Sequence, residues 1–78
     1  MISNTVKAAA SLAGLNRKDL ADAMGLSMAQ AVTNKYGRDS FSGADLVRIA
    51  AACGLRLAFV DDAGKAVLTF PEPTKEEN

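Results

Sequence analysis

The stretch RKDLADAMGLSMAQAVTNKY, residues 17–36, decides the fold. Its first part has the apolar spacing of a short helix, with Leu20 and Met24 on one side. Gly25 follows, where a left-handed residue can close that helix and turn the chain sharply. The pattern after the turn is helical again, to about Tyr36. Two helices joined by a short turn that contains glycine form a helix-turn-helix, which is therefore the predicted centre of the chain.

The helix starts share one pattern, in which a polar residue is followed three positions later by an acid or an amide. Asn16 with Asp19 fits this pattern, as does Ser42 with Asp45. The cap oxygen accepts a free N–H of the first turn, and the later side chain reaches back to the cap. Ser27 is expected to cap the second helix of the pair in the same way, with Gln30 in the weaker third position. The predicted helices lie at about residues 3–13, 17–24, 28–36 and 43–53.

Glycines supply the expected helix ends. Gly25, Gly37 and Gly54 each follow a helical pattern, so each is predicted to stop a helix. The agreement of starts and stops predicts a mainly α fold of four to five short helices. Residues 1–54 form the predicted helical domain.

Beyond Gly54 the apolar period changes from helical to alternating. Residues 55–61 and 65–70 alternate in this way on either side of a turn that contains Gly64, which predicts a C-terminal β-hairpin. Two prolines end the pattern, and residues 71–78 are polar enough to predict a disordered tail.

Composition excludes several classes of protein. The chain has 78 residues, no histidine and one cysteine, so an internal disulfide, a His-based metal site and a His general base are ruled out. We expect no cofactor, no metal and no enzymatic activity. No apolar run approaches the length of a membrane span, and no signal peptide is recognised, so we expect a cytoplasmic location and no membrane partner.

The zero net charge hides an asymmetry along the chain. Residues 1–60 carry seven Lys and Arg against four Asp, whereas residues 61–78 carry two Lys against five acidic residues. A mildly basic body with an acidic tail suits a domain that binds a polyanion.

Residues 4–54 resemble the phage repressor and Cro type of helix-turn-helix domain, the xenobiotic-response-element family. That family usually has Leu and Ala in the first helix of the pair, Gly in the turn and a Ser cap on the second helix. The matching residues of this chain are Leu20, Ala21, Gly25 and Ser27. The segment FSGADLVRIAAACGL, residues 41–55, is similar to the family's following helix. The resemblance implies a lambda-repressor-like fold and a prokaryotic or phage regulator that binds double-stranded DNA at a palindromic operator. The hairpin looks like the β extension of some antitoxin members.

In this family the second helix of the pair lies in the major groove. The family has apolar residues at the positions of Ala31 and Asn34, whereas here Met28, Val32 and Tyr36 form the apolar stripe, one position out of register. The opposite side is polar, and Gln and Asn can read adenine while methyl groups meet thymine. The predicted base-reading residues are Met28, Gln30, Ala31, Thr33 and Asn34. The alternative is an ordinary solvated face.

Polar and basic residues at the start of the second helix and around the end of the third are candidates for binding DNA phosphates. The candidates are Asn16, Arg17, Lys18, Lys35, Arg38 and Ser40. The alternative is that these are solubilising side chains.

A two-stranded hairpin is marginal in water when it stands alone, so we expect the hairpin to pair with that of a second copy in a homodimer. The predicted interface residues are Leu57, Phe59, Leu68 and Phe70. The alternative is a hairpin folded only on its own helices. The expected function is a transcriptional repressor; the alternative is an antitoxin or other interaction module that binds a toxin or another protein through the hairpin and tail.

Overall fold

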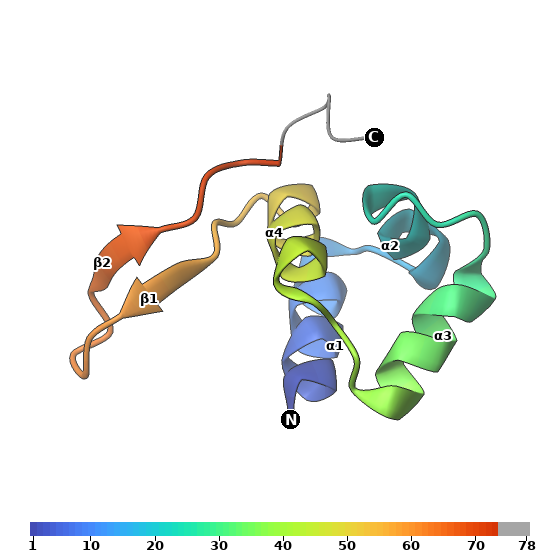
Figure 1. Cartoon of the computed structure of the whole chain (residues 1–78), viewed down its shortest axis with the longest axis horizontal. Helices are drawn as coiled ribbons and strands as arrows, with labels where there is room; N and C mark the ends of the chain where they lie inside the picture. Colours follow the sequence, from blue (N-terminus) through green and yellow to red (C-terminus); the bar gives the residue numbers. More distant parts are fainter. Residues whose placement is uncertain (74–78) are drawn as a thin grey trace.

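Four helices are followed by an antiparallel hairpin in the computed structural model, which describes residues 1–73 (Figure 1). The mainly α prediction is therefore confirmed. The elements are α1 (Ile2–Ala13), α2 (Arg17–Ala23), α3 (Ala29–Arg38), α4 (Gly43–Ala52), β1 (Ala58–Val60) and β2 (Ala66–Thr69). Within the described residues, no helix is both long enough and apolar enough to cross a bilayer.

The starts of α2 and α4 are held by the predicted capping boxes. Asn16 Oδ1 accepts the Asp19 N–H at 2.8 Å, and Asp19 Oδ2 accepts the Asn16 N–H at 2.9 Å. Ser42 and Asp45 make the same reciprocal pair, with both bonds at 3.0 Å. These bonds satisfy amide groups that a helix start leaves free, so both predicted starts are confirmed.

The bounds of α3 differ from the prediction at both ends. Met28 takes the extended conformation of the residue before a helix, so α3 begins at Ala29 and Ser27 lies one position too early to cap it. No side chain caps this start. Gly37 does not end the helix either, because the left-handed residue is Asp39, with φ 54°. An Asp tolerates that conformation better than most residues, so the helix runs on through Arg38.

A pair of hydrogen bonds fixes the end of α3 to the start of α1. The Ser3 N–H donates to Asp39 Oδ1 at 2.6 Å, and the Ser3 hydroxyl donates to the Tyr36 carbonyl oxygen at 2.9 Å. The side-chain and backbone hydrogen bonds with Ser3 lower the pKa of the Asp39 carboxyl. The true end of α3 is thus set by a contact between residues 36 positions apart.

The core lies where the four helices meet. Leu20 on α2 and Val32 on α3 are its largest fully buried side chains. The buried apolar residues are Val6, Ala10, Leu20, Ala21, Met24, Val32, Phe41 and Ile49. Tyr36 packs against this cluster, with its ring 5.6 Å from that of Phe41. The core is small, so each large side chain in it carries much of the stability.

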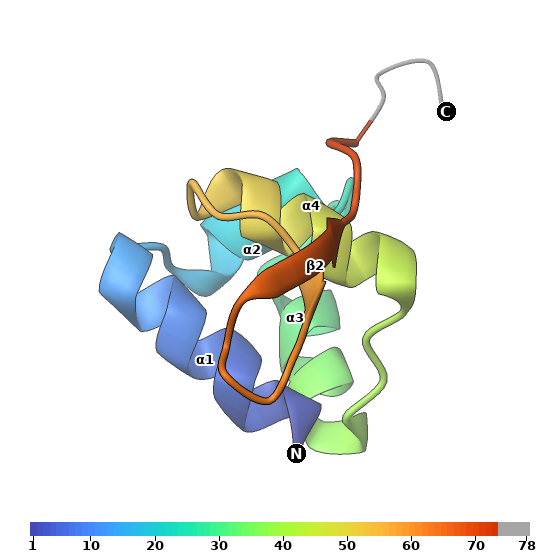
Figure 2. The ribbon, with the colours of Figure 1, turned by 90° about the vertical axis from the view of Figure 1, so that its left-hand side faces the viewer.

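The hairpin is present but its strands are shorter than predicted. Phe59 pairs with Leu68, and the register shifts after Phe59, where Val60 pairs with Ala66. Pairing ends soon after β2 because Pro71 has no N–H to continue a ladder. In Figure 1 the hairpin projects from the helices on the side of α1 and α4 away from α3, and Figure 2 looks at that side.

Candidate nucleic-acid interface

The tight connection between α2 and α3 begins at Gly25, which has φ 74°. Its N–H donates to the Asp22 carbonyl oxygen at 3.2 Å, and the Leu26 N–H donates to the Ala21 carbonyl oxygen at 2.8 Å. Ala21 has no exposed surface, and α2 packs on α3 more extensively than on any other helix. A small side chain at Ala21 and a left-handed glycine thus bring the two helices together as predicted.

One face of α3 is buried and the other is exposed. Val32 is fully buried and Tyr36 is half-buried, whereas Gln30, Asn34 and Arg38 are exposed. These three lie four residues apart, so they share one side of the helix. Met28 is 63% exposed, so its assignment to the apolar stripe was wrong. The cause is the later start of α3, which leaves Met28 outside the helix.

The five predicted base-reading residues divide into two groups. Met28, Gln30 and Asn34 are exposed, and Gln30 Nε2 donates to Asn34 Oδ1 at 3.2 Å. Ala31 and Thr33 are half-buried, and Thr33 Oγ1 accepts a hydrogen bond from Arg17 Nη1 at 2.7 Å. In this conformation Thr33 is engaged with α2.

The candidates at the start of α2 are held to different degrees. The Asn16 side chain serves the capping box. Arg17 is exposed, with its guanidinium 5.2 Å from the centroid of the Tyr36 ring. Lys18 pairs with Asp22 at 2.8 Å on the exposed surface.

Lys35 on α3 is tied to the start of α4. Its Nζ lies 2.9 Å from Asp45 Oδ2, and the two side chains are 26% and 12% exposed. Burial raises the pKa of Asp45, but hydrogen bonds from the Ser42 N–H and from Lys35, with the Lys35 charge, outweigh it, so the pKa lies below its ordinary value. Lys35 therefore has a structural partner. Of the remaining phosphate candidates, Arg38 and Ser40 are both exposed.

One cation near this surface was missed by the sequence prediction. Lys7 Nζ on α1 lies 5.1 Å from the centroid of the Tyr36 ring, which Arg17 also approaches. No local pattern marks Lys7, because folding alone brings it to residues of α2 and α3.

The four predicted interface residues of the hairpin share one face. Phe59 pairs with Leu68, the Phe70 N–H donates to the Leu57 carbonyl oxygen, and the Phe59 and Phe70 rings lie 5.4 Å apart. Phe59 and Leu68 are 62% and 65% exposed, while Leu57 and Phe70 are half-buried. The hairpin thus presents an apolar surface that its own helices cover only in part.

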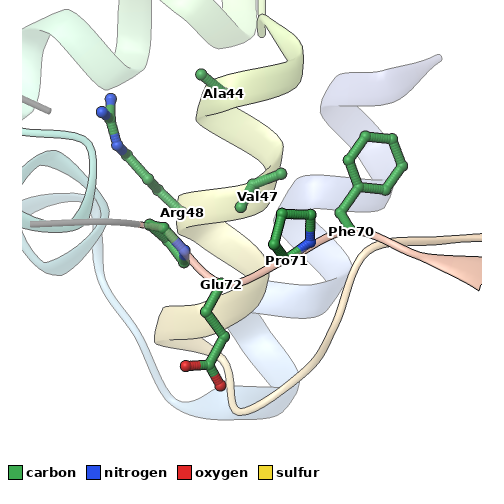
Figure 3. Close-up of a pocket in the computed structure, with 7 residues that line it drawn as sticks. Ala44, Val47, Arg48, Phe70, Pro71 and Glu72 are labelled. Carbon is green, nitrogen blue, oxygen red and sulfur yellow. The ribbon is translucent and has the colours of Figure 1, made fainter.

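The chain after β2 runs along α4. Pro71, Glu72 and Pro73, with Phe70, border a cavity of about 170 Å³ whose other wall is α4, with Ala44, Val47 and Arg48 (Figure 3). Arg56 Nη2 pairs with Glu72 Oε2 at 3.0 Å. Residues 74–78 of the predicted disordered tail lie outside the described residues.

Comparisons with known protein families, with curated proteins and with solved structures give no match for this chain. The resemblance of residues 4–54 to the repressor and Cro type therefore stays a prediction.

Proposed function

We propose that this chain is a sequence-specific DNA-binding transcriptional regulator, a repressor, that reads the major groove with α3 as a homodimer. The observation that carries the proposal is the exposed polar face of α3 next to a tight turn from α2. Gln30, Asn34 and Arg38 point away from the core, while Val32 on the other face anchors the helix. The number of helices, four, agrees with the four to five short helices that the sequence resemblance implies.

The chemistry of this face suits base edges. The bond from Gln30 to Asn34 leaves Gln30 Oε1 as an acceptor and the Asn34 amide as a donor, the pair of functions that an adenine edge requires. Arg38 can donate to guanine or to phosphate. An α-helix about 10–12 Å in diameter fits a major groove about 12 Å wide, so α3 can enter it.

The cations around α3 can hold the phosphates beside the groove. Arg17 and Lys18 stand at the start of α2, and Arg38 stands in the last turn of α3. Phosphate contacts position a protein on the duplex and make its affinity dependent on salt. A monomer offers few such contacts, so two copies on two half-sites of a palindrome would bind far more tightly.

The apolar face of the hairpin supports the homodimer. Phe59 and Leu68 are exposed, and a second copy would cover them. Since the hairpin and α3 lie on opposite sides of the helical body in Figure 1, such a dimer leaves α3 free for DNA.

The test begins with selection of bound sequences from random duplex DNA. We expect the selected site to be a palindrome, and we expect Gln30→Ala and Asn34→Ala to relax the base preference by about 1–3 kcal/mol at single positions. Thr69→Ala in β2 is the matched control, an exposed polar truncation on the hairpin that should leave the preference unchanged. Failure of the wild-type protein to prefer any sequence over random DNA, at any salt concentration, would remove the proposal.

The same exposed hairpin favours a second candidate function, an antitoxin or interaction module that binds a partner protein through the hairpin and tail. The two functions can coexist in one chain. Capture of partners from the native cell, with and without residues 71–78, tests the role of the tail. Identical partners in both experiments would exclude that role.

A further inference from the structure

Two cations meet over one aromatic ring at the junction of α1, α2 and α3. Lys7 Nζ and the Arg17 guanidinium lie 5.1 and 5.2 Å from the centroid of the Tyr36 ring. We call these three residues the Tyr36 cradle. They border an open groove of about 370 Å³, which Ser11 and Asn16 also line.

The positive charges of the cradle are not neutralised by the protein. Within residues 1–73, neither Lys7 nor Arg17 forms an ion pair, whereas Lys18, Lys35 and Arg56 each have a carboxylate partner. Both charges lie near one ring, so they are at most about 10 Å apart and repel each other. An anion between them would relieve this repulsion.

The carboxylate closest in sequence to Arg17 does not fill this role. Asp19 accepts the Asn16 N–H in the capping box. The ring of Tyr36 attracts both cations through its electron-rich face but carries no charge to neutralise them. The cradle is therefore a built positive site without an anion of its own among the described residues.

Arg17 is also held in place before any ligand arrives. Its Nη1 donates to Thr33 Oγ1 at 2.7 Å, which fixes the guanidinium beside the middle of α3. The remaining N–H groups of the guanidinium suit the oxygens of a phosphate, and a side chain that is already ordered loses less entropy on binding. The same bond places the cradle beside the exposed face that α3 presents.

We propose that Lys7 and Arg17, positioned on Tyr36, together bind one backbone phosphate of the DNA strand that borders the groove read by α3. This inference rests on the proposed function. It adds α1 to the DNA-binding surface and assigns Thr33 to positioning Arg17 through their hydrogen bond.

The test compares Lys7→Gln with Lys65→Gln, which removes the same charge from the exposed turn of the hairpin. Affinity for the selected duplex is measured from 50 to 200 mM salt. A whole phosphate contact changes the log–log salt slope by about 0.9, and Arg17 still faces the shared phosphate in Lys7→Gln, so the slope should fall in magnitude by at most about 0.9 and the ratio of wild-type to Lys7→Gln affinity should fall by up to about 3.5-fold over that range. Lys65→Gln should keep the wild-type slope, and Lys7→Arg should restore it. Base preference should be unchanged in all three, and circular dichroism checks that each is folded.

A second readout reports on the cradle directly. Tyr36 is the single tyrosine of the chain, so NMR of protein with ¹³C-labelled tyrosine observes this ring alone. We expect its signals to shift when the selected duplex is added, and to shift less in Lys7→Gln. Inorganic phosphate at the same phosphate concentration should produce a smaller shift than the duplex.

The outcomes separate the two proposals. Selective binding by the wild type together with an unchanged slope in Lys7→Gln, or with an unshifted Tyr36 signal, overturns the cradle and leaves the regulator standing. A shift with inorganic phosphate that equals or exceeds the shift with duplex overturns the assignment to DNA and makes the cradle a site for a free phosphate. Absence of selective binding by the wild type overturns both.

Discussion

The carboxylate of Asp45 joins α3 to α4, and we predict that Asp45→Asn destabilises the fold by about 2 kcal/mol. Asp45 Oδ2 accepts hydrogen bonds from the Ser42 N–H at 3.0 Å and from Lys35 Nζ at 2.9 Å. Asn keeps the shape of the side chain but loses the charge, and it presents an NH₂ group where one carboxylate oxygen was. The substitution thus tests the charge at this position with little change in packing.

The magnitude follows from burial and bond type. A hydrogen bond to a charged group contributes about 1.5–3 kcal/mol net, and a helix cap contributes about 1 kcal/mol. Lys35 is 26% exposed and can turn to water when its partner is lost, so the loss should lie somewhat below their smallest sum of about 2.5 kcal/mol. A loss of about 2 kcal/mol is large for 78 residues, whose total stability is about 4–12 kcal/mol.

The matched control is Asp22→Asn, at the exposed pair with Lys18. The ion-pair distances are nearly equal, 2.8 Å here and 2.9 Å at Asp45, but these side chains are 60% and 62% exposed. An exposed pair of this kind contributes about 0.3–0.5 kcal/mol. Urea unfolding at pH 7, followed by circular dichroism at equal protein concentrations, measures both losses. Equal losses in the two variants would refute the reasoning that burial and capping set the contribution of Asp45.

Wild type and Asp45→Asn can also be compared as a function of pH. The pKa of Asp45 is lowered in the folded state, so its carboxylate stabilises the fold above the unfolded-state pKa of about 3.9, and this contribution disappears as pH falls through the lower folded-state pKa. The stability difference between wild type and Asp45→Asn should therefore be constant from about pH 5 to 7 and shrink below about pH 4. A difference that stayed constant down to about pH 2 would contradict the ionic role.

Three further predictions concern the turn, the core and the hairpin. Gly25→Ala should cost about 1–2 kcal/mol in urea unfolding, because the φ of Gly25 is 74°, a conformation that alanine adopts only with strain, although the added methyl group meets open space. Gly37→Ala, in the last turn of α3 where φ is not positive, should stabilise by up to about 0.5–1 kcal/mol, and equal effects of the two substitutions would contradict the assigned conformations. Leu20→Ala should cost about 2–5 kcal/mol by the same method, and a smaller loss would mean that the site collapses around the cavity. If the chain is a homodimer as proposed, Phe59→Ser with Leu68→Ser should convert it to a monomer in sedimentation experiments while the helices stay folded, and a double variant that stays dimeric would exclude this face as the interface.

Local hydrogen bonds explain why much of the fold could be predicted. The two capping boxes join residues three positions apart, so their partners are visible in the sequence itself. The hairpin turn is similar, since Asp61 Oδ1 accepts the N–H groups of Ala63 and Lys65, and Gly64 supplies φ 84°. Alternating apolar residues then place Phe59 and Leu68 on one face.

Long-range contacts explain what could not be predicted. Glycine is typical of a helix end, which is why Gly37 was predicted to stop α3. The hydrogen bonds from Ser3 to Asp39 and to the Tyr36 carbonyl oxygen hold the chain so that the helix ends at Arg38 instead. Nothing near Ser3 in the sequence marks it as the partner of a residue 36 positions away. The prediction for the start of α3 was wrong for a different reason. Met28 is extended and is the last residue before the helix, so Ser27 lies one position too early to cap it.

In the candidate site, too, the features set by local spacing could be predicted and those set by contacts with other helices could not. The spacing of Gln30 and Asn34 predicted an exposed polar face, and both side chains are exposed. Periodicity could not show that Thr33 accepts a hydrogen bond from Arg17, or that Lys35 pairs with Asp45. Both partners belong to other helices, so a polar side chain on α3 can look free in the sequence and be engaged in the fold.

These lateral contacts bear on how α3 would read DNA. Val32 holds the helix to the core, Thr33 bonds to α2 through Arg17, and Lys35 bonds to α4 through Asp45. Contacts on both flanks resist rotation of α3 about its axis, and rotation decides which side chains reach base edges. If α3 is the reading helix, Asp45→Asn should weaken the preference of the selected site over random DNA, although Asp45 itself need not touch DNA. Asp22→Asn should leave that preference unchanged, since the Lys18 pair lies within α2 and does not hold α3.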